Sequence, residues 1–364
     1  MARWLWALTP LGIIAWILSF FGVPEGILFI LSAIGIVPLA ALIGKATEEL
    51  AYHVGSAAGG LLNATFGNVP ELIIGAFALR AGLVTLAQAS IVGSVIGNAS
   101  LVVGMALFYG GIRNGVQRFN RVAVGHQGVL MVLAVASLAL PSLFTAVQPS
   151  GNVEDLSLFV AGLLILMYLA YMAYSILGYE GGPQSRGGNT FMTEEEEAVE
   201  QLVEEEGGPE WTVTKSVLWL AAATVAVALA SDVLVHAVRP VVLSLGVSEF
   251  FLGVVIVPIV GNVAEHYSAV QLAAKNKLDS SFAVAAGSSV QVALFVAPIL
   301  VALSLLWHPM TLVFNPIEIA VLALVVMIFF FVAQDGESNW LEGLQLLSLY
   351  VMAAAVFFFL PSPI

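Results

Sequence analysis

Eleven stretches of this chain are apolar over about 20 residues, the length that an α-helix needs to cross the hydrocarbon core of a bilayer. Only 10% of the residues are charged, against roughly 25% in soluble domains, so the chain cannot solvate a globular surface of its size. The pattern predicts an all-α polytopic membrane protein with eleven transmembrane helices. Their approximate limits are 4–22, 26–44, 54–79, 84–109, 122–144, 157–178, 215–237, 249–273, 281–306, 316–333 and 341–360.

The composition also excludes several partners and chemistries. A formal net charge of −13 argues against nucleic acid, because phosphate binding needs basic patches. The absence of cysteine removes disulfides, cysteine-ligated metal centres and thiol nucleophiles. The first apolar stretch is longer than the apolar part of a signal peptide, and no small-residue cleavage site follows it. We therefore expect it to remain as a membrane helix.

Basic residues are distributed unevenly between alternate loops. With the N-terminus in the cytoplasm, nine of them lie on the cytoplasmic side and only Arg80 and Arg239 lie outside. Because cytoplasmic loops carry an excess of Lys and Arg, this predicts a cytoplasmic N-terminus and a C-terminus on the opposite side. In a prokaryote the membrane would be the cell membrane. The nine are Arg3, Lys45, Arg113, Arg118, Arg121, Arg186, Lys215, Lys275 and Lys277.

An acidic segment, residues 180–211, separates the sixth and seventh stretches. Its glutamates cluster between Glu194 and Glu206, and Gly and Pro residues bracket the cluster. Thr193 is a good N-cap, and glutamates in a first turn suit the helix dipole, so we expect a short cytoplasmic helix. Two interpretations stay open: a solvated linker between two halves, or a cation-attracting or regulatory element.

Two motifs occur twice with the same separation. The sequence GNVPE at residues 67–71 returns as GNVAE at residues 261–265, an offset of 194. GSVIGNASLVVG at residues 93–104 returns as GSSVQVALFVAP at residues 287–298, with the same offset. A shared offset predicts an internal duplication.

The duplication predicts the architecture. A first helix (1–24) precedes one five-helix repeat (25–179), the acidic segment (180–211) and a second five-helix repeat (212–364). Because five is odd, the second repeat must enter the membrane from the opposite side. Inverted repeats with a site at mid-depth are typical of secondary transporters.

Glu71 and Glu265 carry the functional prediction. Each falls near the middle of an apolar stretch that offers no basic partner at the same depth. A carboxylate in hydrocarbon is costly and normally faces a cavity or a partner. Two uncompensated carboxylates therefore need either protons or a cation.

The neighbouring residues fit a hard cation. Asn68 and Asn262 each precede the glutamate by three positions and share its helix face, and Gly67 and Gly261 allow close approach. Pro70 and Pro258 cannot bond the carbonyls four residues earlier, which would complete an all-oxygen shell of the kind Ca²⁺ prefers. Neutral oxygens on adjacent helices come from Ser94, Asn98, Ser288 and Gln291.

For two glycine-serine pairs and for His266, a purely structural role is an alternative to a role in ion binding or proton transfer. The pairs Gly93-Ser94 and Gly287-Ser288 fit close helix packing as well as cation binding. His266 follows Glu265 directly and so points to another face of the helix. It is either a polar packing group or part of a proton relay.

These motifs resemble a known family. ATEELA at 46–51, LLNATFGNVPELI at 61–73, PIVGNVAEH at 258–266 and GSSVQVALFVAP at 287–298 are similar to the cation/proton exchangers (CAX), the proton-coupled branch of the calcium/cation antiporter superfamily. The acidic segment between the halves is also a family feature. The sodium-coupled branch carries Thr-Ser signatures before the glutamate, which this chain lacks.

The resemblance implies the family's fold, one extra helix plus five and five inverted helices, and a cation site at Glu71 and Glu265. It implies that the second and seventh helices slide against the rest and open each side alternately. By the same analogy Glu48, Glu49 and Asp232 would line the approaches. Members differ in the divalent ion they prefer, and an oxygen-only site favours calcium.

The residues and the resemblance together predict a Ca²⁺/H⁺ antiporter. Its partners would be Ca²⁺, H⁺ and the lipid bilayer; no cofactor is expected, Ca²⁺ is the transported substrate, and the oligomeric state stays open. The alternative is a Na⁺/Ca²⁺ exchanger, although the fourth and ninth stretches lack the further acid that sodium sites need. An intramembrane enzyme is disfavoured because the chain has no HExxH or GxSxG motif, and a passive channel would conduct without a counter-gradient.

Overall fold

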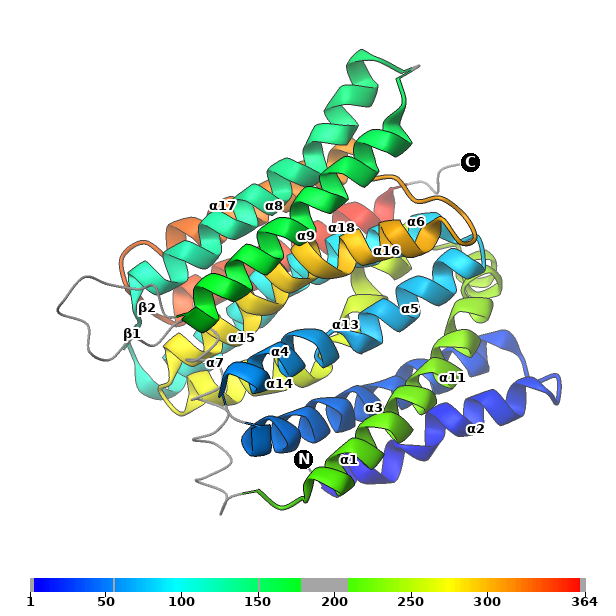
Figure 1. Ribbon diagram of the computed structural model, residues 1–364, viewed down its shortest axis with the longest axis horizontal. Coiled ribbons are helices and arrows are strands. Elements are labelled where there is room, and N and C mark those ends of the chain that lie inside the picture. The colour runs from blue at the N-terminus through cyan, green and yellow to red at the C-terminus, as the bar shows by residue number, and fades with distance from the viewer. Residues whose placement is uncertain (1–2, 55, 150, 178–208, 361–364) are drawn as a thin grey trace.

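The computed structural model describes residues 3–54, 56–149, 151–177 and 209–360, and these residues fold almost entirely into helices (Figure 1). One antiparallel pair of two-residue strands, β1 and β2, joins two of the connecting loops. The elements are α1 (Arg3–Leu8), α2 (Pro10–Ser19), α3 (Glu25–Val54), α4 (Ser56–Phe66), α5 (Val69–Arg80), α6 (Val84–Ile96), η1 (Gly97–Val102), α7 (Val103–Asn114), β1 (Gln117–Arg118), α8 (Arg121–Val147), α9 (Val153–Leu177), α11 (Val213–Leu245), α12 (Glu249–Phe251), η2 (Leu252–Ile256), α13 (Val257–Gly261), α14 (Val263–Ala274), α15 (Leu278–Gln291), η3 (Val292–Val296), α16 (Ala297–Ser304), α17 (Pro316–Val332), β2 (Glu337–Ser338) and α18 (Trp340–Phe359).

Each of the eleven expected stretches falls on a helix or on consecutive helices. By length and composition, seven of the described helices can cross a membrane, and the bent pair 249–261 and 263–274 is an eighth. Two further apolar helices, Trp6–Ser19 and Pro316–Val332, are shorter. The chain is thus a polytopic helical membrane protein, and the count of eleven stays a prediction.

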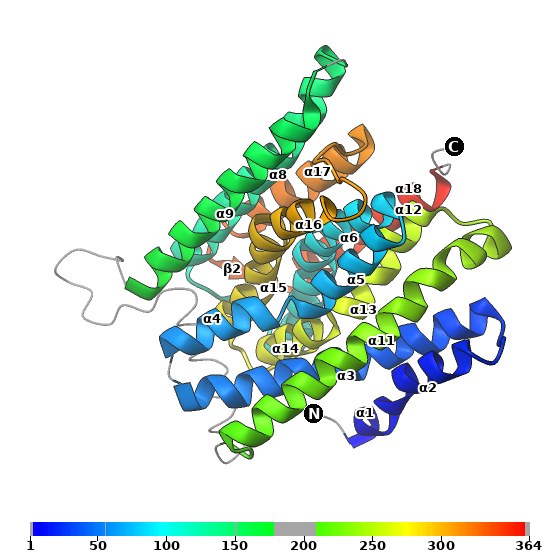
Figure 2. The same ribbon diagram turned by 45° about the vertical axis from the view of Figure 1, so that its right-hand side comes forward.

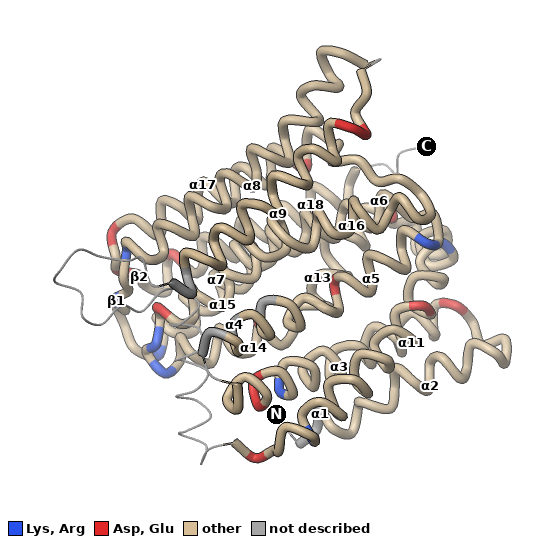
Figure 3. Tube along the Cα trace, viewed as in Figure 1, with Lys and Arg blue, Asp and Glu red and all other residues tan. Residues whose placement is uncertain are grey.

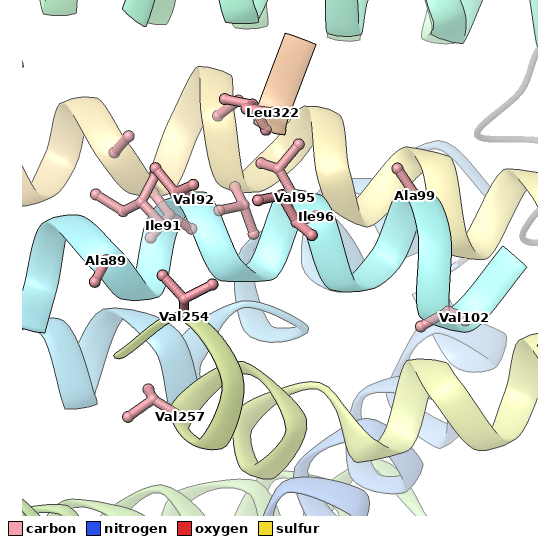
Figure 4. Packing of buried hydrophobic residues seen from close by; sticks show 14 of the residues in the cluster. Ala89, Ile91, Val92, Val95, Ile96, Ala99, Val102, Val254, Val257 and Leu322 are labelled. Atoms are coloured by element: carbon pink, nitrogen blue, oxygen red, sulfur yellow. The ribbon is translucent and has the colours of Figure 1, made fainter. Parts of the chain in front are cut away.

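Two helices form the centre of the bundle. The span from α6 through η1 to α7 is 83% buried, and the span from α15 through η3 to α16 is 89% buried, whereas α8 and α18 are only 28% buried. In Figure 4 the apolar side chains of α6 and η1 meet those of η2, α13 and α17, including Val254, Val257 and Leu322. Near-continuous apolarity in these two helices is what permits burial on all sides.

Two groups of helices lie on either side of this centre. Figure 2 shows α1, α2, α3 and α11 on one side and α8, α9 and α17 on the other. Both groups expose large apolar side chains, among them Ile30 of α3 and Phe159 of α9. A soluble surface of this kind would aggregate, but it is the surface that lipid requires.

Two helical regions of the protein are interrupted at the repeated Gly-Asn motif. Helices α4 and α5 meet at Asn68 (φ −94°, ψ 9°), and helices α13 and α14 meet at Asn262 (φ −99°, ψ 17°). The second break bends the chain by 62°. Pro70 stands in the first turn of α5, where its missing N–H costs nothing. The expectation of continuous helices at residues 54–79 and 249–273 is therefore corrected: each has a break beside its glutamate.

Candidate cation site

A small cavity lies between the first half and the second half of the chain. Its volume is about 50 Å³, enough for an ion with a few water molecules. It is lined by residues of α3, α4, α5, α13, α14 and α15 and by the break at Gly67. The lining residues are Ala40, Gly44, Glu48, Asn63, Gly67, Pro70, Gly261, Ala264, Glu265, Ser268, Val284, Ser288 and Gln291.

Glu265 lines this cavity, whereas Glu71 is not among its lining residues and lies against Gly261, which is one of them. Each stands in the first turn after a helix break, Glu71 in α5 and Glu265 in α14. A methyl group built on Gly261 would lie 3.1 Å from Glu71 Oε1, so the backbone of one motif touches the carboxylate of the other. The glycine is needed there because a side chain would compete with the carboxylate for space.

The carboxylate oxygens are buried without partners. Glu71 is only 8% exposed, and neither of its oxygens accepts a hydrogen bond from any residue the structure describes. Glu265 Oε2 is in the same situation. Buried carboxylates are normally paired or hydrogen-bonded, so these oxygens have the capacity to hold a ligand that supplies positive charge.

The predicted amides and hydroxyls form hydrogen bonds between the two halves. Asn68 Nδ2 donates to Gln291 Oε1 at 2.6 Å, Asn262 Nδ2 donates to Ser94 Oγ at 3.2 Å, and Asn98 Nδ2 donates to Ser288 Oγ at 2.8 Å. These bonds occupy amide N–H groups. The amide oxygens of Asn98 and Asn262 are buried and accept no hydrogen bond from the described residues.

The π-helical segments adjoin this network. Asn98 lies within η1, and Gln291 is the last residue before η3. Such insertions are frequent at functional sites, because they redirect side chains and backbone carbonyls without ending the helix. The Val254 carbonyl, which Pro258 cannot bond, lies against Gly93 of α6 and not within the cavity wall.

The arrangement suits a hard cation or protons. Within the part of the chain described, no three His, Cys, Asp or Glu side chains gather as a metal cluster, so a bound ion would depend on two carboxylates and neutral oxygens. Oxygen-only coordination favours Ca²⁺ over the softer transition metals. In the absence of the ion, the same oxygens are places for protons.

The residues predicted to line the approaches to the site do not all lie at the cavity. Glu48 lines the cavity together with Glu265. Glu49 lies elsewhere: its carboxylate accepts the backbone N–H of Trp211 at 2.9 Å. Asp232 is half exposed and lies 3.5 Å from His236 on its own helix. His266 is half-buried and does not line the cavity.

The acidic segment lies mostly outside the described residues, which include only 209–211 of it.

The cavity also includes Asn63 and Ser268, which the sequence motifs did not identify as site residues. Helical spacing would have found both, because Asn63 precedes Gly67 by four residues and Ser268 follows Glu265 by three.

Known proteins resemble this chain over nearly its whole length. The family described as "Sodium/calcium exchanger protein" matches residues 25–177 and 215–359. The Ca²⁺/H⁺ antiporter ChaA of Bacillus subtilis (strain 168) is 39% identical over 97% of each chain. The Ca²⁺/H⁺ antiporter of Synechocystis sp. is 41% identical over 93% of this chain and 92% of its own. The solved structure of native YfkE superposes with a TM-score of 0.80 at 36% identity, covering 97% of this chain and 98% of that one.

Proposed function

Because the chain belongs to the cation/proton exchanger branch of the sodium/calcium exchanger protein family, we propose that it is a secondary antiporter that exchanges Ca²⁺ for protons. The relatives that carry this function by name match the whole chain and not one part of it. The observation that carries the proposal is the pair Glu71 and Glu265, three of whose four carboxylate oxygens are buried without a hydrogen-bond partner among the described residues. Such a site needs positive charge from outside the protein.

Competition for the same oxygens would couple the two fluxes. Two carboxylates neutralise one Ca²⁺, or they bind protons when the ion leaves. An empty, doubly charged site would be costly to enclose in a low-dielectric interior, which suppresses movement without cargo. This arithmetic gives at least two protons per Ca²⁺, and an inward proton gradient would export Ca²⁺ from the cytoplasm.

We extend the proposal to the architecture of eleven membrane helices, with an N-terminal helix (1–24) and inverted five-helix repeats (25–179 and 212–364) around the segment 180–211. Similar backbone breaks at Asn68 and Asn262 support it, as do π-helical segments at matching places in α6–α7 and α15–α16. Charged residues gather toward the ends of the bundle in Figure 3, as membrane-crossing helices require. The uneven distribution of Lys and Arg supports a cytoplasmic N-terminus.

Sodium coupling is the alternative, and it is less supported. The relatives reported above are named for Ca²⁺ and H⁺. Residues 84–114 and 281–304 of the two central spans contain no Asp or Glu that would add to a sodium site. A sodium gradient is therefore expected to drive no uptake.

Radioactive Ca²⁺ uptake into proteoliposomes tests the proposal. We expect uptake when a proton gradient is imposed without sodium, and loss of uptake when a protonophore collapses the gradient. Uptake that required a sodium gradient would assign the chain to sodium exchange. A Ca²⁺ uptake rate that depended on neither gradient would identify a passive channel and contradict the proposal.

A further inference from the structure

A polar and aromatic cluster joins one end of α3 to the start of α11. Glu49, in the second-last turn of α3, is only 4% exposed. One of its carboxylate oxygens accepts the backbone N–H of Trp211 at 2.9 Å, and the other lies 3.8 Å from Lys45 Nζ. We call Lys45, Glu49, His53, Glu210 and Trp211 the α3–α11 clamp.

The other members of the clamp contact one another. Lys45 Nζ donates to Glu210 Oε2 at 2.9 Å, and His53 Nε2 lies 2.7 Å from the backbone oxygen of Trp211. The Trp211 side chain is 5% exposed, and Lys45 and Lys215 lie 5.5 Å and 4.7 Å from its ring centre. Both backbone polar groups of Trp211 are therefore bonded to α3 side chains.

The adjacent residues Glu48 and Glu49 therefore contact different parts of the molecule. Glu48 lines the cavity together with Glu265, whereas the Glu49 carboxylate contacts Trp211, just before α11. Neighbouring helical residues point about 100° apart, so a rigid α3 carries both orientations together. A movement of Trp211 away from α3 would also shift the start of α11, which packs along α3.

The chemistry of the clamp favours a contact that persists. Opening it would leave the buried Glu49 carboxylate and the Trp211 N–H without partners and would expose the indole ring. The hydrogen bond from Lys45 lowers the pKa of the Glu210 carboxyl, so their ion pair also survives moderate acidity. The clamp therefore has no reason to open when protons replace the cation.

We propose that Glu49 is a positioning residue, which holds the start of α11 against α3 throughout the exchange cycle. The inference rests on the proposed Ca²⁺/H⁺ exchange, since it assigns a role within that cycle. It separates Glu49 from Glu48, the adjacent carboxylate, which keeps its place at the cavity.

Cross-linking tests whether the clamp stays closed. The chain contains no cysteine, so a short bismaleimide would react only with the pair introduced by Lys45→Cys and Glu210→Cys. This pair removes the Lys45–Glu210 ion pair and keeps the hydrogen bond from Trp211 to Glu49, so the yield reports on the contact that Glu49 makes. We expect the same cross-linking yield with saturating Ca²⁺ at alkaline pH and without Ca²⁺ at acidic pH. The cross-linked protein should keep most of the Ca²⁺ uptake of the same variant before cross-linking. A yield that collapses in one condition, or uptake abolished by the cross-link, would overturn the inference.

Glu49→Gln in the same two-cysteine background tests the residue itself. We expect the yield and the maximal uptake rate to fall about fivefold, with the Ca²⁺ concentration for half-maximal uptake unchanged. Glu48→Gln is the matched control and should leave the yield intact. An unchanged yield in Glu49→Gln would contradict the positioning role. If no variant transports under a proton gradient, the proposed function fails, while the yields still decide whether the clamp stays closed.

Discussion

At the scale of single residues, the position of Glu71 and Glu265 in first turns determines what they can bind. The free N–H groups of a first turn place partial positive charge near a carboxylate, which favours its ionised form. Burial opposes ionisation by removing water. A carboxylate under both influences can exchange a proton for a cation, provided that the cation brings enough charge.

Glutamine substitutions at Glu71 and Glu265 test whether Ca²⁺ binding depends on the negative charge of these side chains or only on their volume. Glu71→Gln or Glu265→Gln removes one negative charge and keeps the volume of the side chain, and we expect Ca²⁺ affinity to fall about 100-fold with loss of exchange. Titration calorimetry on purified protein measures the affinity. Glu318→Gln is the matched control, because Glu318 is also a buried first-turn glutamate but bonds the backbone N–H of Asn315. Equal loss in all three variants would show that burial, and not the site, explains the effect.

The close approach of Gly261 to Glu71 gives a second prediction. In Gly261→Ala the new methyl group would meet Glu71 Oε1 at 3.1 Å and displace the carboxylate by a few tenths of an ångström. We expect Ca²⁺ affinity to fall about tenfold in a protein with normal thermal stability. The control is Gly125→Ala, since a methyl group there meets nothing within 4 Å. Unaltered affinity in Gly261→Ala would mean that the carboxylate does not need its present position.

At the scale of elements, the crossing of α6 and η2 sets the distance between the halves. The backbone of Val254 lies so close to Gly93 that an added methyl group would clash with the Val254 carbonyl oxygen. On the other side of the same crossing, a methyl group on Gly253 would lie 2.6 Å from Ala89 Cβ. Small residues on both sides allow two helices to approach at backbone distance. This crossing brings Ser94 within reach of Asn262.

Gly93→Ala should therefore act through packing. Overpacking of this crossing is expected to destabilise the protein by about 2 kcal/mol and to separate Ser94 from Asn262. The measurement is the midpoint of thermal unfolding in detergent, again with Gly125→Ala as the reference for a harmless methyl group. A midpoint equal to that of the wild type would indicate that α6 and η2 are not in this close contact.

Local patterns could predict the helices but only part of their detail. Apolar runs located each helical region, because a bilayer requires apolarity over a whole span. The repeated GNxxE motif indicated where the candidate site lies. The breaks at Asn68 and Asn262 were not predicted, although Pro70 gave a signal at one of them. The role of Glu49 was out of reach, because its partner Trp211 is 162 residues away and such contacts leave no periodic signal.

At the scale of the whole molecule, a single site that binds either Ca²⁺ or protons would account for the proposed exchange. Lower pH favours the protonated carboxyls, so the apparent affinity for Ca²⁺ must fall as the pH falls, by about tenfold per pH unit for each proton displaced. The halves that meet at the site come from opposite ends of the chain. A movement of α3 and α11 against the central helices would therefore change access to it from either side.

The number of protons released per bound Ca²⁺ tests this account most directly. Calorimetric titrations of the detergent-solubilised protein in buffers of different ionisation enthalpy give that number. At a pH where both carboxyls are protonated, we expect about two protons per Ca²⁺ in the wild type and fewer in Glu71→Gln or Glu265→Gln. Ca²⁺ binding without proton release, with the same affinity at acidic and alkaline pH, would contradict the account.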